Sequence, residues 1–272
     1  MARIVLLEHE FQRGEESMVY AFAEHWRRAG HTVITHRGSA EPPPGDVAIL
    51  HLDVTVIPAE YHPLLSRYRR VLNGKVLDIS KRAYSQHLLS RGDGSWRGPV
   101  IVKTNTNFLG RPEAFINEAA RRAGRTPPLP PTYLARGYPV FDSLAQVPEA
   151  IWANPDAVVE RFLPERDEQG RYCVRVWTFF GERERCVKWH AREKIVKASN
   201  TVERTPLEPP RELRAWRERL GFDFGKFDYV VHEGKELLLD ANRTPSFPTE
   251  QSPNALAAAA DLAAGIDGFL AS

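Results

Sequence analysis

The fold is decided by the stretch Phe227-Asp228-Tyr229-Val230-Val231-His232-Glu233-Gly234-Lys235-Glu236-Leu237-Leu238-Leu239-Asp240-Ala241-Asn242. Two runs of strand-forming residues flank a Glu-Gly turn, so the stretch predicts a hairpin with strands over residues 227–232 and 235–240. Asp228 and Asp240 then lie near opposite positions, and Asn242 shares a face with Asp240 because side chains two apart point the same way. Carboxylate and carboxamide oxygens suit Mg²⁺ held jointly with phosphates. The hairpin therefore predicts a metal site made of Asp228, Asp240 and Asn242.

Three earlier segments carry further polar residues at the ends of predicted elements. Val100-Ile101-Val102-Lys103 is an apolar strand that ends in a lysine. Val158-Val159-Glu160-Arg161-Phe162-Leu163 is a strand that ends in a carboxylate and a loop. Ser80-Lys81-Arg82 begins a helix predicted over residues 81–90. Each of these polar residues alone could occupy an ordinary surface position. The order and spacing of the segments are what indicate a shared functional site.

In that order the segments resemble the ATP-grasp superfamily, especially D-alanine–D-alanine ligase and the RimK-like carboxylate–amine ligases. Asp228 with Asp240-Ala241-Asn242 resembles the Asp and Glu-x-Asn by which that family holds two Mg²⁺ ions. The resemblance covers about residues 73–262 and implies ATP and Mg²⁺ as cofactors. It also implies a set of nucleotide-binding residues, in which two lysines bind the phosphates and a hinge brackets the adenine: Lys81, Lys103, Glu160, Arg161, Phe162 and Leu163.

The chain departs from the family pattern at three places. Asp240 replaces the usual Glu, which shortens the reach to a metal by one methylene, and Mg²⁺ geometry is strict. Lys226 stands where many ligases have Arg. The segment 104–110 after Lys103 contains a single glycine, whereas many members cover the phosphates with a Gly-rich loop there. Closure over the phosphates is therefore in question.

The whole chain predicts a mixed α/β (α+β) architecture. Strands at residues 3–7, 31–35 and 46–52, with a helix at 15–29, predict a parallel α/β layer. No G-x-G-x-x-G follows the first strand, so this layer is not predicted to bind a dinucleotide. The resemblance implies an ATP-grasp fold behind this N-terminal domain. The expected divisions are residues 1–72 for the N-terminal pre-ATP-grasp domain, 73–155 for the small subdomain, and 156–272 for the C-terminal subdomain with the metal-binding hairpin.

Composition excludes several other classes of protein. The 272 residues include 37 Lys and Arg against 35 Asp and Glu, a formal net charge of +2, which gives no argument for a nucleic-acid partner. The sequence contains no run of 18 consecutive apolar residues, so no membrane-spanning helix is predicted. Cys173 and Cys186 are too few for a four-ligand zinc site or a disulfide scaffold. A reducing, cytoplasmic setting is expected, without nucleic acid or membrane as partner.

The resemblance implies a ligase that activates a carboxylate as an acyl phosphate for attack by an amine or similar nucleophile, releasing ADP and phosphate. The substrates would be small-molecule or peptide carboxylates and amines. Cations near the reacting group would stabilise developing negative charge, and the predicted catalytic residues are Arg175, Lys226 and Arg243. The sequence does not indicate the oligomeric state.

Several alternatives stay open. Arg175 could instead pair across strands with Glu184, and Asn242 could cap the turn at Thr244-Pro245. The fold could also serve a kinase that releases a phosphorylated product, or a non-catalytic nucleotide-binding module. The shortened Asp240 and the glycine-poor segment after Lys103 are the features that favour the last of these.

Overall fold

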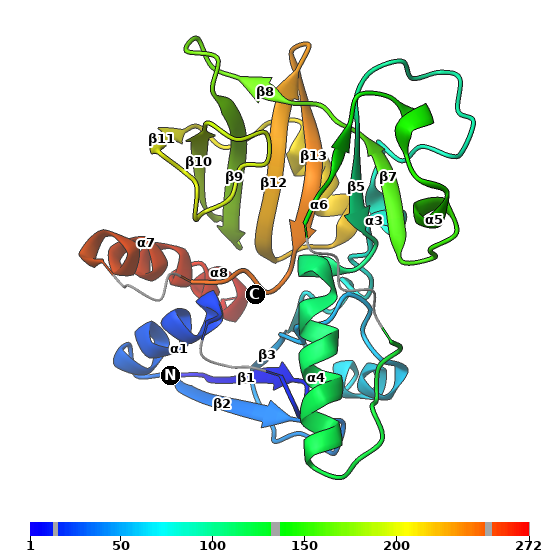
Figure 1. Cartoon of the computed structure of the whole chain (residues 1–272). Coiled ribbons are helices and arrows are strands. Elements are labelled where there is room, and N and C mark those ends of the chain that lie inside the picture. The colour runs from blue at the N-terminus through cyan, green and yellow to red at the C-terminus, as the bar shows by residue number, and fades with distance from the viewer. Residues whose placement is uncertain (13–15, 132–136, 248–251, 272) are drawn as a thin grey trace.

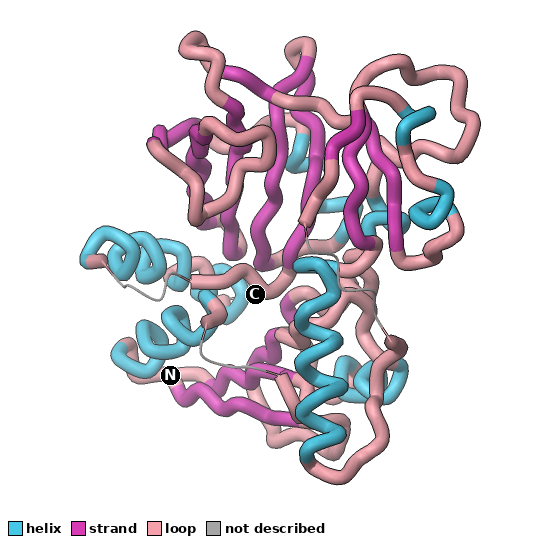
Figure 2. Tube along the Cα trace, in the orientation of Figure 1, coloured by secondary structure: helices cyan, strands magenta, loops and turns pink. Residues whose placement is uncertain are grey.

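The computed structural model describes residues 1–12, 16–131, 137–247 and 252–271 of the chain. Its strands form three sheets, of which the parallel one lies at the bottom of Figure 1 and the two antiparallel ones lie above it. Figure 2 shows that helices gather around the lower sheet and beneath the ends of the upper ones. The predicted mixed α/β fold is confirmed.

The first sheet is parallel and has the order β2-β1-β3-β4. Its strands are β1 Arg3–Glu8, β2 Thr32–Arg37, β3 Val47–Leu50 and β4 Val71–Leu72. In β1 the residues from Ile4 to Leu7 are all fully buried. Parallel sheets are covered on both faces, so their strands are continuous apolar runs rather than alternating ones. The expected parallel layer is therefore present, with β4 as a short fourth strand that the sequence did not predict.

Segments from distant parts of the chain cover the two faces of this sheet. Ile4 and Leu6 pack on the face that carries helices α1 (Met18–Arg28), α7 (Pro253–Ala263) and α8 (Ile266–Leu270). Val5 and Leu7 pack on the other face, against Ile116 of α4 (Arg111–Arg122). Figure 1 shows α4 descending from the strand β5 to lie beside the lower sheet. The N-terminal layer is thus completed by α4 and by α7 with α8, which follow β1 by about a hundred and about two hundred and fifty residues.

The second sheet is six-stranded and contains the predicted hairpin. Its main path is β11-β10-β9-β12-β13, and β8 pairs with β9. One face packs Trp177, Phe179 and Phe227 against helix α6 (Leu213–Leu220). The other face is turned toward the third sheet (Figure 1). The strands are β8 Glu165–Arg166, β9 Tyr172–Phe180, β10 Arg183–Ala191, β11 Glu203–Leu207, β12 Phe224–His232 and β13 Lys235–Asn242.

The third sheet has the order β6-β5-β7, with β5 Val100–Thr104, β6 Val140–Phe141 and β7 Ala157–Arg161. Strand β7 pairs antiparallel with β5 along its whole length. The subdomain boundary expected at residues 155/156 therefore separates two paired strands, and the small sheet extends to Arg161. Its outer face packs against the short helix α5 (Glu149–Trp152).

Two predicted helices differ from those in the structure. The helix expected at 81–90 is only α3, Lys81–Tyr84, because residues 87–89 take hydrogen bonds along β7 instead: Leu89 donates to Val159, and Arg161 donates to His87. The Ala-rich helix expected at about 254–270 is divided into α7 and α8 just before Gly265, whose Cα lies against Phe180. A Cβ at Gly265 would meet the Phe180 carbonyl oxygen at 2.1 Å, so this close approach needs glycine.

Among the helices of the described residues, none is long and apolar enough to cross a membrane. The short helix α2 (His62–Leu65) and the turns around it complete the N-terminal layer.

Candidate functional site

The two aspartates of the hairpin face each other directly. Asp228 of β12 is the register partner of Asp240 of β13, as predicted. The register shifts immediately after this pair, because Tyr229 pairs with Leu238 and leaves Leu239 as an extra residue. Tyr229 and Leu238 belong to the core under α6, so the aspartates point to the opposite face, toward the third sheet. The bulge thus holds both carboxylates at the edge of a pocket.

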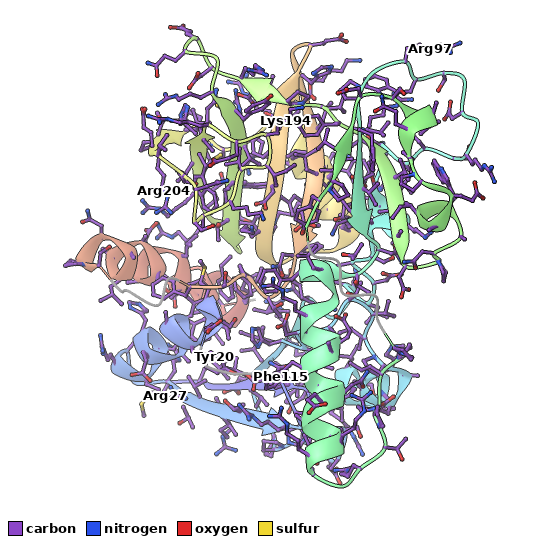
Figure 3. All side chains as sticks on the ribbon, viewed as in Figure 1. Tyr20, Arg27, Arg97, Phe115, Lys194 and Arg204 are labelled. Atoms are coloured by element: carbon purple, nitrogen blue, oxygen red, sulfur yellow. The ribbon has the colours of Figure 1, made fainter. Side chains whose placement is uncertain are left out.

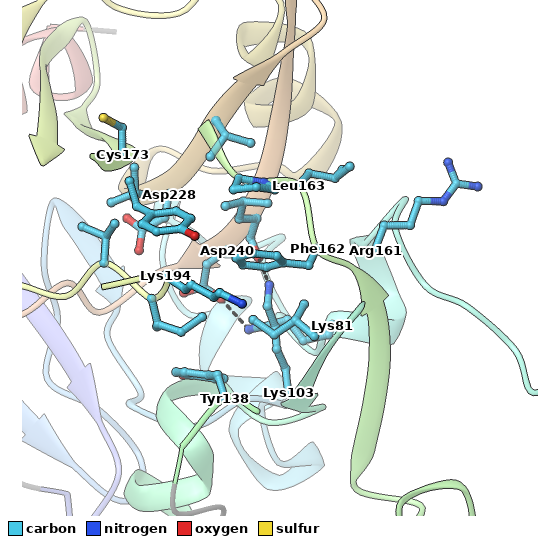
Figure 4. A pocket seen from close by; sticks show the side chains of 18 residues that line it. Lys81, Lys103, Tyr138, Arg161, Phe162, Leu163, Cys173, Lys194, Asp228 and Asp240 are labelled. Atoms are coloured by element: carbon cyan, nitrogen blue, oxygen red, sulfur yellow. Dashed lines mark hydrogen bonds and ion pairs between the residues drawn. The ribbon is translucent and has the colours of Figure 1, made fainter. Parts of the chain in front are cut away.

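Three lysines and three carboxylates of this region pair one to one. Lys81 of α3 donates to Asp240 Oδ1, Lys103 of β5 lies 2.7 Å from Glu160 Oε2, and Lys226 of β12 lies 2.9 Å from Asp228 Oδ2. Lys103 also donates to the carbonyl of the bulged Leu239 at 3.1 Å. Lys81 and Lys103 thereby join α3 and the third sheet to the hairpin, through Asp240 and the Leu239 carbonyl (Figure 4). The three lysines and three carboxylates compensate one another's charge.

Burial and these pairs shift the carboxyl pKa values in opposite directions. Burial acts to raise the pKa of Asp240, but the Lys81 charge and hydrogen bond outweigh it and lower the pKa to about 2. Burial raises the pKa of Asp228, and the negative charge of Asp240 adds to this beyond what Lys226 compensates. Burial likewise opposes ionisation of Glu160, but Lys103 holds its pKa below the ordinary value. Asp228 is thus the carboxylate whose negative charge is least compensated.

The donor set at Asp228 fits a divalent cation. Its Oδ1 atom is buried and has no hydrogen-bond partner among the described residues. A buried carboxylate oxygen without a partner carries a substantial desolvation cost. Two opposed carboxylates supply the hard oxygen ligands that Mg²⁺ prefers. Asp228 and Asp240 are therefore the residues that would hold the metal.

The predicted nucleotide-binding residues line the same pocket. Lys81, Lys103, Arg161, Phe162 and Leu163 all contribute to its wall, together with the two aspartates. Figure 4 shows Phe162 and Leu163 beside Asp240 and the side chain of Arg161 pointing away from the pocket. The pocket therefore has a polar end at the lysines and an apolar end at the loop that follows β7.

That loop offers one free backbone donor. The N–H of Arg161 donates to His87, and that of Phe162 donates to Pro99. Within the described residues, the N–H of Leu163 makes no hydrogen bond to a backbone carbonyl. The resemblance implies that the backbone of Arg161 and Leu163 contacts the adenine; the N–H of Arg161 is already used, and that of Leu163 is available. Glu160 lies behind them, where it holds Lys103.

Arg175 lies on the wrong face of the sheet for the role that was predicted for it. It alternates with Val174 and Val176 along β9 and shares the face of Trp177, under α6. Its guanidinium donates to both oxygens of Glu165 at 2.9–3.1 Å. The predicted substrate contact is therefore not supported. The expected alternative of an ion pair is correct in kind, but the partner is Glu165 rather than Glu184.

Arg243 is also a structural residue in this fold. Its side chain is fully buried and, among the residues that the structure describes, donates only to backbone carbonyls, those of Leu52, Val54, Thr55 and Val76. Burial lowers the pKa of Arg243 to about 10. The guanidinium joins the exit of β3 and the segment after β4 to the end of β13, so it cannot reach a substrate without unfolding this junction.

Lys226 and Asn242 lie on the face predicted for them. They are register partners next to the aspartate pair. Asn242 Oδ1 accepts the Thr244 N–H at 2.9 Å, which is the turn cap that was the alternative reading. This oxygen is thus already engaged, and its role as a metal ligand stays a prediction. Of the three predicted catalytic cations, Lys226 is the one that lies beside Asp228 in the structure, and its catalytic role stays a prediction.

Sequence reasoning missed three residues of the site. Tyr84 donates to Asp240 Oδ1 at 3.2 Å and accepts from the Ala241 N–H. Its position three residues after Lys81 on a helical turn was a usable signal. Lys194 and Tyr138 also line the pocket. Figure 3 places Lys194 in front of the six-stranded sheet, on the loop after β10, and nothing in the sequence marked it or Tyr138.

A second polar cluster lies on the far face of the same sheet. The Cys173 Sγ and Asp167 Oδ2 atoms lie 3.4 Å and 2.8 Å from His190 Nδ1. This trio has the residue types of a metal site, but Arg171 already supplies its cation, with Nε 2.7 Å from Asp167 and Nη2 3.4 Å from His190. Burial raises the pKa of Cys173, which opposes a reactive thiolate. The cluster is best described as a charge network that joins β8 to β11.

No protein-family model and no curated protein matches this sequence. Solved structures do match it over its whole length. A RimK domain ATP-grasp protein from Sphaerobacter thermophilus aligns with a TM-score of 0.53 at 15% identity, covering 100% of both chains. A RiPP-associated ATP-grasp ligase of Chryseobacterium gregarium, in complex with ADP and a leader and core peptide, aligns with a TM-score of 0.51 at 11% identity over 96% of each chain.

The D-cycloserine synthetase DcsG aligns with a TM-score of 0.50 at 12% identity, covering 98% of this chain and 99% of the other. The structural alignments show a shared fold, and at identities this low they show the fold alone. The fold expected from the order of the sequence motifs is therefore confirmed.

Proposed function

The chain has the ATP-grasp fold, and on that premise we propose that the protein is an ATP-dependent ligase. One observation carries the proposal. Two opposed aspartates and two buried or half-buried lysines from separate segments converge on one pocket, and the other end of that pocket is apolar. A nucleoside triphosphate has the matching chemistry, since its base is planar and largely apolar at one end and its phosphates are anionic at the other.

The chain's own residues would exchange partners when ATP binds. Lys81 and Lys103 now neutralise Asp240 and Glu160. Phosphoryl transfer needs positive charge on the phosphates and an in-line acceptor. The two lysines would supply that charge by turning from carboxylate to phosphate oxygens. Asp228 and Asp240 would hold Mg²⁺, which would supply further positive charge to the phosphates and would compensate Asp240 once Lys81 has turned away.

The finer proposal concerns the reaction. The acceptor would be a substrate carboxylate, which takes the terminal phosphoryl group and becomes an acyl phosphate with release of ADP. An amine or similar nucleophile would then displace phosphate and form the new bond. Lys226, beside Asp228, is the cation positioned to stabilise negative charge on the acyl group. A small molecule or a peptide would supply the carboxylate, and the peptide complex of the Chryseobacterium ligase supports including peptides.

Product analysis tests this proposal without knowledge of the natural substrate. The full chain would be incubated with ATP and Mg²⁺ against panels of carboxylic acids and amines, and adenine nucleotides would be separated chromatographically. ADP and phosphate that form only when both an acid and an amine are present support the ligase. AMP with pyrophosphate would contradict it, and a stable phosphorylated acceptor formed without any amine would identify a kinase.

The Asp228→Asn variant provides the matched control for the site. It keeps the shape of the side chain but removes the carboxylate that fits a cation, so it should lose turnover with every substrate pair. Nucleotide binding with no turnover in the wild-type chain against any pair would instead favour the non-catalytic module.

A further inference from the structure

The segment that follows Lys103 does not cover the pocket. The Asn105 N–H donates to the Asp156 carbonyl at 2.7 Å, and the Asn107 N–H donates to Thr55 Oγ1 at 2.8 Å. Gly110, the single glycine of this segment, has φ 74° and is the N-cap of α4. The backbone donors of Asn105 and Asn107 are thus used to attach the segment to the small sheet and to the N-terminal layer.

The same connection returns to the pocket at Tyr138. The segment is tied to β5 directly after this residue, because Val102 donates to the Pro139 carbonyl at 2.9 Å and Ile101 pairs with Val140. Tyr138 lines the pocket with Lys81 and Lys103. Figure 4 shows it beside Lys103, away from Leu163 and the apolar end.

The charges around Tyr138 belong to the polar end. Burial raises its pKa to about 12, with contributions from Asp240 and Asp228 that raise it and from Lys81 and Arg111 that lower it. Both aspartates line the same pocket as Tyr138. A phenol with this pKa remains protonated at neutral pH, so its hydroxyl can donate a hydrogen bond.

We propose that Tyr138 binds the terminal phosphate of ATP through its hydroxyl, and so does the work that a glycine-rich loop after Lys103 would otherwise do. This inference rests on the proposed function, since it needs ATP in the pocket. The donor is neutral and the acceptor anionic, which makes the hydrogen bond charge-assisted. ADP lacks the group that Tyr138 contacts, so the residue discriminates ATP from ADP.

Isothermal titration calorimetry of the full chain tests this without any turnover. A non-hydrolysable ATP analogue and ADP are each titrated with Mg²⁺ into the wild type and into Tyr138→Phe. Losing a hydrogen bond to a charged group should weaken the analogue by about tenfold to a hundredfold. The affinity for ADP should stay unchanged, so that the ratio of the two dissociation constants shifts by the same factor.

Tyr172→Phe is the matched control. Tyr172 also lines the pocket, but it lies four residues along β9 from Val176, the register partner of Asp228. Its hydroxyl accepts from Arg166. This variant should change the affinities for the two nucleotides by a common factor. A Tyr138→Phe variant with an unchanged ratio would overturn the inference while leaving the proposed function intact. A wild-type chain that binds neither nucleotide would overturn both.

Discussion

Lys81 of α3 forms an ion pair with Asp240 of β13, 159 residues later in the chain. The lysine side chain is 6% exposed and that of the aspartate 29%. The pair is one of three in which a lysine of this region holds one carboxylate. A ligand that is both anionic and accompanied by a cation can replace both partners at once, whereas an anion alone would leave the carboxylates uncompensated. Binding of nucleotide and of metal should therefore depend on each other.

Lys81→Met tests the pair from the lysine side. Met keeps the bulk and removes the charge, so Asp240 is left beside Asp228 without its main countercharge. We expect a loss of about 1–3 kcal/mol in the free energy of unfolding at pH 7, less than for a fully buried pair because Asp240 is partly exposed.

The pH dependence gives the sign. Without Lys81, the pKa of Asp240 should lie above its unfolded value, so the variant should regain stability as the pH falls and the carboxyl is protonated. Urea unfolding at pH 5 and pH 8 measures this. Lys235→Met, at an exposed position of the same hairpin, is the control and should be neutral at both values. A Lys81→Met loss that is equal at both pH values would contradict the assignment.

Asp228→Asn separates stability from cation binding. The substitution removes a buried charge with an unpartnered oxygen and also the partner of Lys226, so we expect a change of less than about 1 kcal/mol in unliganded stability. At about 100 times the dissociation constant, Mg²⁺ with an ATP analogue should stabilise the wild type by about 2.7 kcal/mol. Thermal unfolding should show that the Mg²⁺-dependent part of this gain is lost in the variant. Its full retention would exclude Asp228 as a ligand.

Arg243→Ala distinguishes a structural role from a substrate contact. The substitution leaves the carbonyls of Leu52, Val54, Thr55 and Val76 without their donor in a buried junction. We expect a loss of about 3–5 kcal/mol in stability. Arg243→Lys should recover little, because an ammonium cannot reproduce the planar fork. A stable but inactive Arg243→Ala would restore the substrate role predicted from the sequence.

Glu165→Gln tests the ion pairs that Glu165 forms with Arg175 and Lys188. Burial opposes ionisation of Glu165, but hydrogen bonds from Arg175, Lys188 and the Val231 N–H lower its pKa below the ordinary value. A lowered carboxyl pKa gives stability that is present above the unfolded pKa and is lost as the pH falls through the folded one.

The variant should therefore lose about 1–2 kcal/mol at pH 7, and the difference from wild type should shrink below about pH 4.5. Urea titrations at pH 7 and pH 3.5 measure both values. Glu233→Gln in the exposed hairpin turn should match wild type throughout. A gap between Glu165→Gln and wild type that widens at low pH would contradict the sign.

The hairpin that carries Asp228 and Asp240 was predictable because its two strand-forming runs and its turn are local features of the sequence. The turn at Glu233-Gly234 sets the register as far as Tyr229 and Leu238, and on its own it would place Asp228 opposite Leu239. The bulge at Leu239, which the sequence did not predict, brings Asp240 opposite Asp228. The face of the strand on which a side chain lies was harder to predict. Arg175 was predicted to contact substrate, but it alternates along β9 with Val174 and Val176 and shares the face of Trp177 and Phe179, which pack on α6. The alternation of these bulky residues along β9 is the sequence signal that indicates this face.

Other features depended on contacts that one sequence does not contain. Arg243 was predicted to be a catalytic cation, yet its hydrogen bonds go to carbonyls of residues 52–55 and 76. The helix expected over 81–90 stops at Tyr84 because the edge of β7 offers hydrogen bonds to residues 87–89. In both cases tertiary hydrogen bonding overrides a local pattern.

The covering of the N-terminal sheet has a consequence for how the chain reaches its native state. One face of that sheet is closed by α4, and the other by α1 together with α7 and α8, which end at Leu270. Trp26 of α1 donates to the Ala263 carbonyl at 2.8 Å across this late contact. During synthesis, β1 to β4 emerge before α4, α7 and α8, so one face of the sheet stays open until α4 has been made, and the other is covered only by α1 until α7 and α8 follow. The first part of the chain to be made is therefore among the last to become stable, and removing only the C-terminal helices should unfold the opposite end of the protein.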